Sequence, residues 1–307
     1  MTNRRSPISK LSEIFDKIVR FRKRLSVRKQ NALFVSPGHF YSPIPSIAEI
    51  KNNEEKIFGN IPRNIEGVDL HQEEQLKLLT QLLDYYKQLP DYKPEPQIGL
   101  RYYYQNSEYK YCDAILLFCM IMHLKPKRII EVGSGYSSCL ILDTNEIFFN
   151  NSIITEFIDP YPQRFLSHIK ESDRSRIELR PSPLQDVEID MFESLQANDI
   201  LFIDSTHVCM TYSDVNRIFF EILPRLSSGV YIHFHDIFYP FEYPKKWVYE
   251  GRAWNEAYLL RAFLQYNQTF QIALMNTYME YYFDTFFREN MPLCLNAKGG
   301  SIWIRKV

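Results

Sequence analysis

Polar side chains suited to acid–base chemistry or metal binding follow two apolar runs of this sequence. Asp204 and His207 close the run LFIDSTH, and His235 and Asp236 close the run IHFHD. Short apolar runs of this kind are typical of buried parallel strands. Ligands of open parallel sheets bind beyond the carboxyl ends of the strands. We therefore expect these four side chains to converge on one crevice.

Three interpretations of this group remain open. In the first, which we favour, His207 or His235 is a general base that removes a proton from an acceptor hydroxyl or amine. In the second, Asp204, His235 and Asp236 hold a divalent metal that acts as a Lewis acid. A mixture of histidine and aspartate suits Zn, Fe or Mn better than Mg. In the third, the His–Asp pairs only satisfy one another, and for His233, deeper in the same run, packing is the favoured interpretation.

A strand, a glycine turn and a helix start are predicted over residues 128–138, RIIEVGSGYSS. Glycines in such a turn let a ligand approach the backbone, and the free N–H groups of the helix start point toward it. A second apolar run, Ile153 to Ile158, ends in Asp159, where an acid can accept hydrogen bonds from ribose hydroxyls. Ser137 or Ser138 replaces the third glycine of a dinucleotide fingerprint, which favours a nucleoside without phosphates.

Five segments together resemble one family. EVGSGYSS, FIDPYP, LFIDSTH, HFHDIF and WNEAYLL look like class I S-adenosylmethionine-dependent methyltransferases, and most closely like a bacterial subgroup with the signature HDIF…EYP…WNE. The resemblance covers roughly residues 36–307. It implies S-adenosyl-L-methionine as the cofactor.

The predicted donor site follows from this resemblance and from the turn. Its spine is Glu131, Gly133, Gly135 and Asp159. Ser134, Tyr136 and Ser137 offer N–H or hydroxyl groups to the amino-acid carboxylate of the donor. Gln185 and Asp186 are placed to meet the adenine edge, with an ordinary surface turn as the alternative.

Two segments are predicted to recognise the acceptor. Prolines keep residues 38–46 extended, and His39, Phe40 and Tyr41 are expected to form a lid there, with a plain linker as the alternative. The second segment, residues 238–260, supplies Tyr243, Trp247 and Trp254 as aromatic surfaces, and Arg252 to grip a carboxylate or phosphate. Helix capping and substrate contact are equally open for Asn255 and Glu256.

Composition limits the partners. The net charge is −1, so no general attraction to nucleic acid or to a membrane surface is expected, and a small-molecule or peptide acceptor is favoured. Five widely spaced cysteines without a CxxC pair indicate reduced thiols in a cytoplasmic protein. No apolar run is long enough to span a bilayer, and no signal peptide is recognised.

The N-terminal segment differs from the rest in charge. Residues 1–30 carry ten lysines and arginines against two acids. Apolar residues recur at helical spacing between Leu11 and Leu25. We expect a helix that docks on the body of the protein or forms a homodimer contact, with an anionic surface as the alternative partner.

The order of the elements predicts an α/β protein. Helices are expected at 72–88 and 113–124, and then strands alternate with helices, which indicates a Rossmann-like doubly wound sheet. Strands are expected near 128–132, 153–158, 176–180, 199–204, 229–235, 269–275 and 300–306, the last two forming an antiparallel hairpin edge joined by a loop. Helices are expected near 136–147, 161–171, 190–196, 212–225 and 253–266. Residues 1–110 are assigned to an N-terminal helical cap with the lid, and residues 111–307 to the methyltransferase domain.

The favoured function is methylation of an oxygen or nitrogen atom with a histidine base. Two rivals remain open. One is a metal-dependent oxygenase or hydrolase on the same fold, and the other is a non-catalytic protein that binds an acidic partner through residues 1–30. Fold alone does not decide among them.

Overall fold

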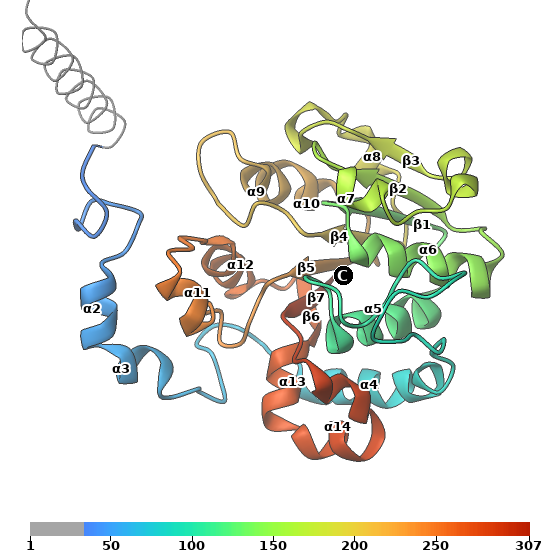
Figure 1. The fold of residues 1–307 in the computed structure, drawn as a ribbon. Coiled ribbons are helices and arrows are strands. Elements are labelled where there is room, and N and C mark those ends of the chain that lie inside the picture. The colour runs from blue at the N-terminus through green and yellow to red at the C-terminus, as the bar shows by residue number, and fades with distance from the viewer. Residues whose placement is uncertain (1–33) are drawn as a thin grey trace, which may run out of the picture. The chain divides into compact units, whose positions relative to one another are not determined.

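The computed structural model describes residues 34–307, which form two compact units (Figure 1). The first contains residues 34–60 and 245–253, and the second contains residues 61–244 and 254–307. Residues 61–110 therefore belong to the same unit as most of the predicted methyltransferase domain, and the functional division at residue 110 stays a prediction. The predicted basic helix, and the homodimer contact assigned to it, lie outside the described residues.

The second unit is built on a seven-stranded sheet with the order β3-β2-β1-β4-β5-β7-β6. All neighbouring strands pair in parallel except β7, which is antiparallel to both β5 and β6. The strands are β1 (Arg128–Val132), β2 (Ile154–Ile158), β3 (Glu178–Arg180), β4 (Ile200–Ile203), β5 (Tyr231–His235), β6 (Phe270–Met275) and β7 (Ser301–Lys306). The predicted Rossmann-like sheet is confirmed, as is the antiparallel pairing of its last two strands.

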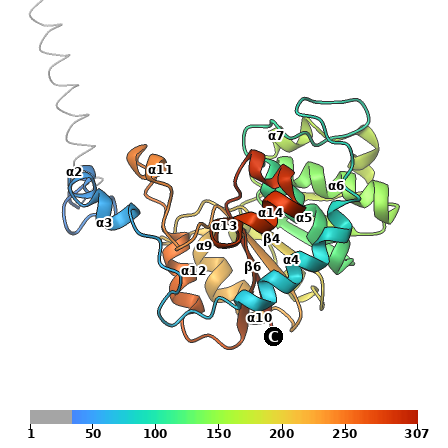
Figure 2. The ribbon, with the colours of Figure 1, turned by 90° about the horizontal axis from the view of Figure 1, so that it is seen from below.

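Helices cover both faces of the sheet, which explains why its central strands are continuous apolar runs. Figure 2 shows α4 (Gln72–Tyr86), α5 (Tyr111–Leu124) and α6 (Tyr136–Phe149) on one side, with α9 (Asp214–Arg217) and α12 (Glu256–Leu264) on the other. Because α5 is packed between neighbours, nearly all of its residues are buried, as its apolar sequence predicts. In the described part of the chain, no helix is both long and apolar enough to cross a bilayer.

The connection between β6 and β7 was predicted incorrectly. The chain forms α13 (Asn276–Tyr282), α14 (Asp284–Asn290) and a 3₁₀ turn at Pro292–Asn296 instead of a simple loop. Met279 and Phe287 are fully buried in these helices. Burial of such side chains outweighs weak helix propensity, which is why the sequence pattern alone missed them.

Several predicted helices are shorter or interrupted. Helices α7 (Gln163–Leu166), α8 (Asp190–Glu193) and α10 (Leu223–Arg225) are each about one turn, and 3₁₀ turns cover Glu171–Ser175 and Leu184–Asp186. The predicted helix 212–225 contains a π-helical segment at Ile218–Ile222, which ends two residues before Pro224. Proline lacks the N–H of a regular helical ladder, which accounts for the break.

The first unit contains three short helices, α2 (Ile47–Asn52), α3 (Glu54–Phe58) and α11 (Lys245–Tyr249). The Glu54 carboxylate of α3 contacts α11 by accepting hydrogen bonds from Lys245 Nζ at 2.5 Å and from the Tyr249 hydroxyl. The guanidinium of Arg252 lies 4.3 Å from the ring centre of Trp247.

A buried ionic network joins Arg101 and Tyr102 to the helices beside the sheet. The Arg101 side chain is 1% exposed and donates to Asp143 at 2.8 Å and to Asp173 at 2.7 Å. It also reaches Glu146 at 2.6 Å, and Asp143 accepts the backbone N–H groups of Arg101 and Tyr102. Such a network holds only while every charge has a partner.

Replacing Arg101 by alanine should therefore destabilise the second unit strongly. It leaves Asp143 and Asp173 buried without a cation, so we expect a loss of about 3–5 kcal/mol in the free energy of unfolding. Arg174, which pairs with Glu171 at the surface, is the matched control, and Arg174→Ala should cost less than about 1 kcal/mol. Urea unfolding measures both variants, and equal small losses would contradict a stabilising role of the network.

Candidate active site

A cleft opens at the carboxyl ends of β1, β2 and β4, and we call it the donor cleft. Its volume is about 460 Å³, within the range of small-molecule sites. Its walls include Gly133 and Ser134 after β1, Asp159 after β2, Gln185 before α8, and Asp204 after β4. The predicted donor residues after three different strands thus reach one cavity.

The two glycines of the turn have different structural reasons. Gly133 has φ +82°, and a Cβ there would lie 2.0 Å from the backbone oxygen of Asp204. Gly133 therefore permits close contact between the turns after β1 and β4. Gly135 is extended, and a Cβ at this position would meet no other atom within 4 Å. Packing therefore does not explain a glycine at position 135. The space that a side chain would take there is open and leaves room for a ligand at the start of α6.

Asp159 is held at the wall of the cleft. Its Oδ2 accepts hydrogen bonds from Ser134 N at 2.9 Å and Ser134 Oγ at 2.8 Å, and its Oδ1 accepts one from Tyr161 N at 2.7 Å. A carboxylate offers about four lone-pair sites, so capacity for a further donor remains. The role of Asp159 in ribose binding stays a prediction.

Glu131 is fully buried and does not line the donor cleft. Ser137 Oγ donates a hydrogen bond to Oε1, whereas Oε2 has no partner among the described residues. Burial raises the pKa of Glu131 to about 8, although its serine contacts oppose the shift. The carboxyl is therefore mostly protonated at neutral pH. Its contact with Ser137 supports the first turn of α6.

The remaining predicted donor residues occupy different places. The Tyr136 hydroxyl lies 3.2 Å from the Tyr103 hydroxyl. Gln185 lines the cleft, and its side-chain amide donates to the backbone oxygen of Tyr212 at 2.8 Å. Asp186 is not among the residues that line the cleft. Adenine contact by Gln185 or Asp186 stays a prediction.

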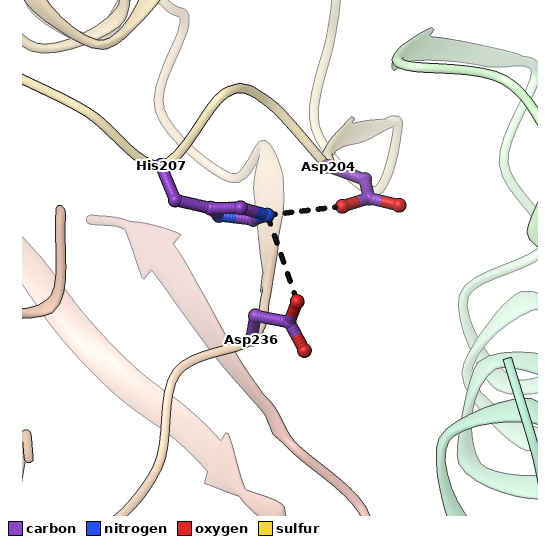
Figure 3. A group of neighbouring side chains, drawn as sticks. All are labelled: Asp204, His207 and Asp236. Atoms are coloured by element: carbon purple, nitrogen blue, oxygen red, sulfur yellow. Dashed lines mark ion pairs between the residues drawn. The ribbon is translucent and has the colours of Figure 1, made fainter. Parts of the chain in front are cut away.

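Asp204, His207 and Asp236 form a compact group that we call the Asp–His cluster (Figure 3). His207 Nε2 lies 3.4 Å from Asp204 Oδ1 and 3.6 Å from Asp236 Oδ2. One ligand atom from each residue lies within 4.8 Å of the others. The cluster is contiguous with the donor cleft, because Asp204 belongs to both.

The four polar side chains lie close to one another, but of the four only Asp204 lines the donor cleft, so their convergence on one crevice stays a prediction. The group that could hold a metal differs in one member from the predicted metal set. His207 faces both carboxylates, whereas His235 Nε2 lies 3.5 Å from the other oxygen of Asp236. His235 Nδ1 has no partner among the described residues. The loop after β4 turns back at His207, which has φ +59°, and this brings its imidazole over the end of β5.

Neighbouring acids determine the charge of His207. Burial alone lowers its pKa, but contacts with Asp204 and Glu256 outweigh burial and raise the pKa well above the ordinary value. For Asp204 the directions are reversed. Burial raises its pKa, but the nearby imidazoles of His235 and His207 outweigh burial and lower the pKa. The Asp204–His207 pair therefore favours an imidazolium facing a carboxylate.

The pKa values of His235 and Asp236 are both raised, but for different reasons. Burial lowers the pKa of His235, but Asp236 and Asp204 outweigh it and raise the pKa. Burial raises the pKa of Asp236 despite the two imidazoles beside it. Titratable groups with perturbed pKa values that lie together at one strand edge are typical of functional sites.

Sequence reasoning missed the contact between Glu256 and His207. The Glu256 carboxylate is fully buried and lies 2.8 Å from His207 Nδ1, and it accepts a hydrogen bond from Ser205 Oγ at 3.1 Å. The only signal was the run WNE at a predicted helix start. Asn255 occupies the N-cap position of α12, but its side chain binds Cys209 instead of capping the helix.

His233 is packed in the core. It is fully buried, its ring lies 4.1 Å from that of Phe202, and neither nitrogen has a hydrogen-bond partner among the described residues. Burial lowers its pKa well below the ordinary value, which agrees with a neutral packing residue.

Predicted acceptor residues are divided between the two units. Trp254 and Tyr243 belong to the second unit, where the Trp254 ring lies 4.4 Å from His207 and 6.0 Å from Tyr243. Tyr243 is buried, and its hydroxyl accepts the N–H of Ala257 at 3.1 Å. His39, Phe40, Tyr41, Trp247 and Arg252 belong to the first unit. Acceptor binding by all of these residues stays a prediction.

The sheet order, the glycine turn and the cleft at the strand ends together define a Rossmann-like methyltransferase fold. Residues 130–237 match the family model described as a methyltransferase domain. An uncharacterised protein of Archaeoglobus fulgidus is 40% identical over 178 residues, which cover 57% of this chain and 80% of that protein. The chain belongs to the same family as this archaeal protein. The predicted enzyme class, a methyltransferase, is confirmed by the domain match.

Solved structures with a similar fold are distant in sequence. The apo structure of CmcI-N160 shares 17% identity at a TM-score of 0.44, over 73% of this chain and 84% of its own. The S-adenosylhomocysteine-bound methyltransferase PaMTH1 of Podospora anserina shares 16% at 0.41, over 87% and 99%. At such distances, finer functional conclusions depend on the residues of this chain.

The buried carboxyl of Glu131 predicts a pH-dependent stability. Its pKa rises from 4.5 to about 8 on folding, so the folded chain holds a proton that the unfolded chain releases. The stabilising contribution is complete below the lower value and is lost as pH rises through the upper one. Relative to Glu131→Gln, the wild type should lose up to about 1.4 kcal/mol per pH unit between about pH 5 and pH 8.

Urea unfolding of both proteins across this pH range measures the difference. Glu131→Gln is the matched variant because its amide oxygen can still accept from Ser137 but cannot ionise. A difference that stays constant across the range would contradict the raised pKa.

Proposed function

We propose that this methyltransferase binds S-adenosylmethionine in the donor cleft and transfers its methyl group to a hydroxyl oxygen of a small-molecule or peptide acceptor, with His207 as the general base. The observation that carries the proposal is the position of His207 beside Asp204, whose side chain lies 3.4 Å from His207 Nε2 and which lines the donor cleft. A base next to a bound sulfonium can remove the acceptor proton while the methyl group transfers in line.

The cleft supports the donor assignment through its shape and its polar groups. Asp159 offers a carboxylate to ribose hydroxyls, as acids at the end of the second strand do in nucleotide-binding sheets. The open side of Gly135 leaves the first N–H groups of α6 accessible to the donor carboxylate. The sulfonium is already an activated methyl donor, so orientation and exclusion of water supply much of the remaining rate.

The acidic neighbours of His207 serve the proton transfer. Asp204, Asp236 and Glu256 stabilise the imidazolium of His207 that forms when this base accepts a proton. The same acids raise the resting pKa of His207, so a neutral base requires additional positive charge nearby. The donor sulfonium supplies such a charge when it binds, and its field lowers the proton affinity of His207.

A divalent cation is a second candidate component, favoured by the grouping of Asp204, His207 and Asp236. Two carboxylates and an imidazole nitrogen are a donor set that suits Mn, Fe or Zn. When bound, the cation would supply Lewis-acid polarisation of an acceptor oxygen. The two carboxylates would then be its ligands, and His207 would either join them or remain the base.

Donor binding should depend on Asp159. Asp159→Ala removes the predicted ribose contacts, each a hydrogen bond to a charged group worth about 1.5–3 kcal/mol, so the dissociation constant should rise about 10- to 100-fold. Asp84→Ala is the matched control because Asp84 pairs with Lys87 at the surface of α4 and does not line the cleft, and it should change the constant by less than about twofold. Calorimetric titration with S-adenosylmethionine measures both. Equal affinities in wild type and Asp159→Ala would contradict the placement of the ribose.

Methyl transfer should depend on His207 more than donor binding does. His207→Gln removes the base, so transfer of a tritiated methyl group to a pool of hydroxylated small molecules should fall about 10²- to 10⁴-fold. Its affinity for S-adenosylmethionine should change far less than its rate of methyl transfer. His71→Gln, at the start of α4, is the control and should keep full transfer. Full transfer by His207→Gln would exclude the histidine base and favour activation by a cation alone.

A further inference from the structure

His207 contacts the start of α12 as well as Asp204 and Asp236. Its backbone oxygen accepts hydrogen bonds from Asn255 N at 3.0 Å and from Glu256 N at 3.2 Å. These contacts cross a sequence separation of about fifty residues and hold the loop after β4 in its left-handed bend at His207.

Side chains of the same three-residue run strengthen this attachment. Asn255 Oδ1 accepts from Cys209 N at 2.6 Å, and Asn255 Nδ2 donates to Cys209 O at 3.2 Å. The ring of Trp254 lies 4.4 Å from the imidazole of His207. Trp254, Asn255 and Glu256 thus each contact a different part of the loop.

The Glu256 carboxylate contacts the imidazole of His207 and fixes the orientation of its ring. This carboxylate is 0% exposed and has two partners, His207 Nδ1 at 2.8 Å and Ser205 Oγ at 3.1 Å. An ionised carboxylate can only accept hydrogen bonds, so the proton of that contact belongs to Nδ1 of the imidazole. Nε2 is consequently the nitrogen that faces Asp204 and Asp236 and can exchange its proton or bind a cation.

We propose that Glu256 is the positioning residue of this active site: it holds His207 with Nδ1 protonated and Nε2 directed at the Asp–His cluster, while Trp254 and Asn255 clamp the loop. This inference rests on the proposed role of His207 at the acceptor side. It assigns the run WNE to the support of His207, whereas the sequence suggested helix capping or substrate contact.

The test is a long-range ¹H–¹⁵N NMR spectrum of the full chain labelled with ¹⁵N-histidine, recorded at one neutral pH. The His207 signals are assigned by their absence in His207→Gln. We expect a hydrogen-bonded Nδ1–H signal in the wild type that exchanges slowly with water. In Glu256→Gln, whose neutral amide can donate as well as accept, this signal should shift upfield and exchange at least about tenfold faster. Glu256→Asp should restore part of the effect.

Glu242→Gln is the matched control, because Glu242 accepts from the Tyr258 hydroxyl of the same helix at 2.6 Å without contacting His207. It should leave the His207 signals unchanged. A wild-type spectrum with His207 protonated only at Nε2 would overturn the inference, as would unchanged His207 signals in a folded Glu256→Gln. Should Glu256→Gln fail to fold, the wild-type spectrum and Glu256→Asp decide the matter.

Donor titration separates this inference from the proposed function. Wild type, Glu256→Gln and Glu242→Gln should bind S-adenosylmethionine with dissociation constants within about twofold of one another, because Glu256 does not line the donor cleft. Absence of donor binding in the wild type would reject the proposed function. The protonation pattern of His207 would still test the positioning role of Glu256.

Discussion

The contact between the turns after β1 and β4 determines where the functional groups of this protein lie. The backbone oxygen of Asp204 occupies the space that a Cβ of residue 133 would need. This approach places Asp204 on the wall of the donor cleft and, at the same time, beside His207. Because a glycine at position 133 permits this contact, the donor cleft and the Asp–His cluster lie at the same edge of the sheet.

Charge balance is the second requirement of the site. Asp204, Asp236 and Glu256 surround His207 and would repel one another if no cation lay among them. The imidazolium of His207 supplies that positive charge in the folded chain. A donor sulfonium or a divalent cation brings more positive charge to the same place, so ligand binding and the protonation of His207 are coupled. Such coupling suits the proposed role of His207 as a base that is protonated and deprotonated within one reaction cycle.

Much of this arrangement could be predicted from the sequence because parallel strands bring their carboxyl ends to one edge. The runs ending at Asp159, Asp204 and Asp236 indicated both the strands and the crevice. The sequence could not show which imidazole turns toward the two carboxylates, because the left-handed bend at His207 depends on contacts with α12 some fifty residues away. The role of Glu256 was hidden for the same reason. Helices α13 and α14 were missed because tertiary burial, and not local periodicity, stabilises them.

The most direct test of the account is a crystal structure of the protein with S-adenosylmethionine. The account predicts the donor in the cleft formed by the ends of β1, β2 and β4, with its ribose hydroxyls on Asp159 and its methyl carbon on the side of His207. A donor bound elsewhere, or one whose methyl group points away from His207, would contradict the central claim that one strand edge unites the donor site with the base.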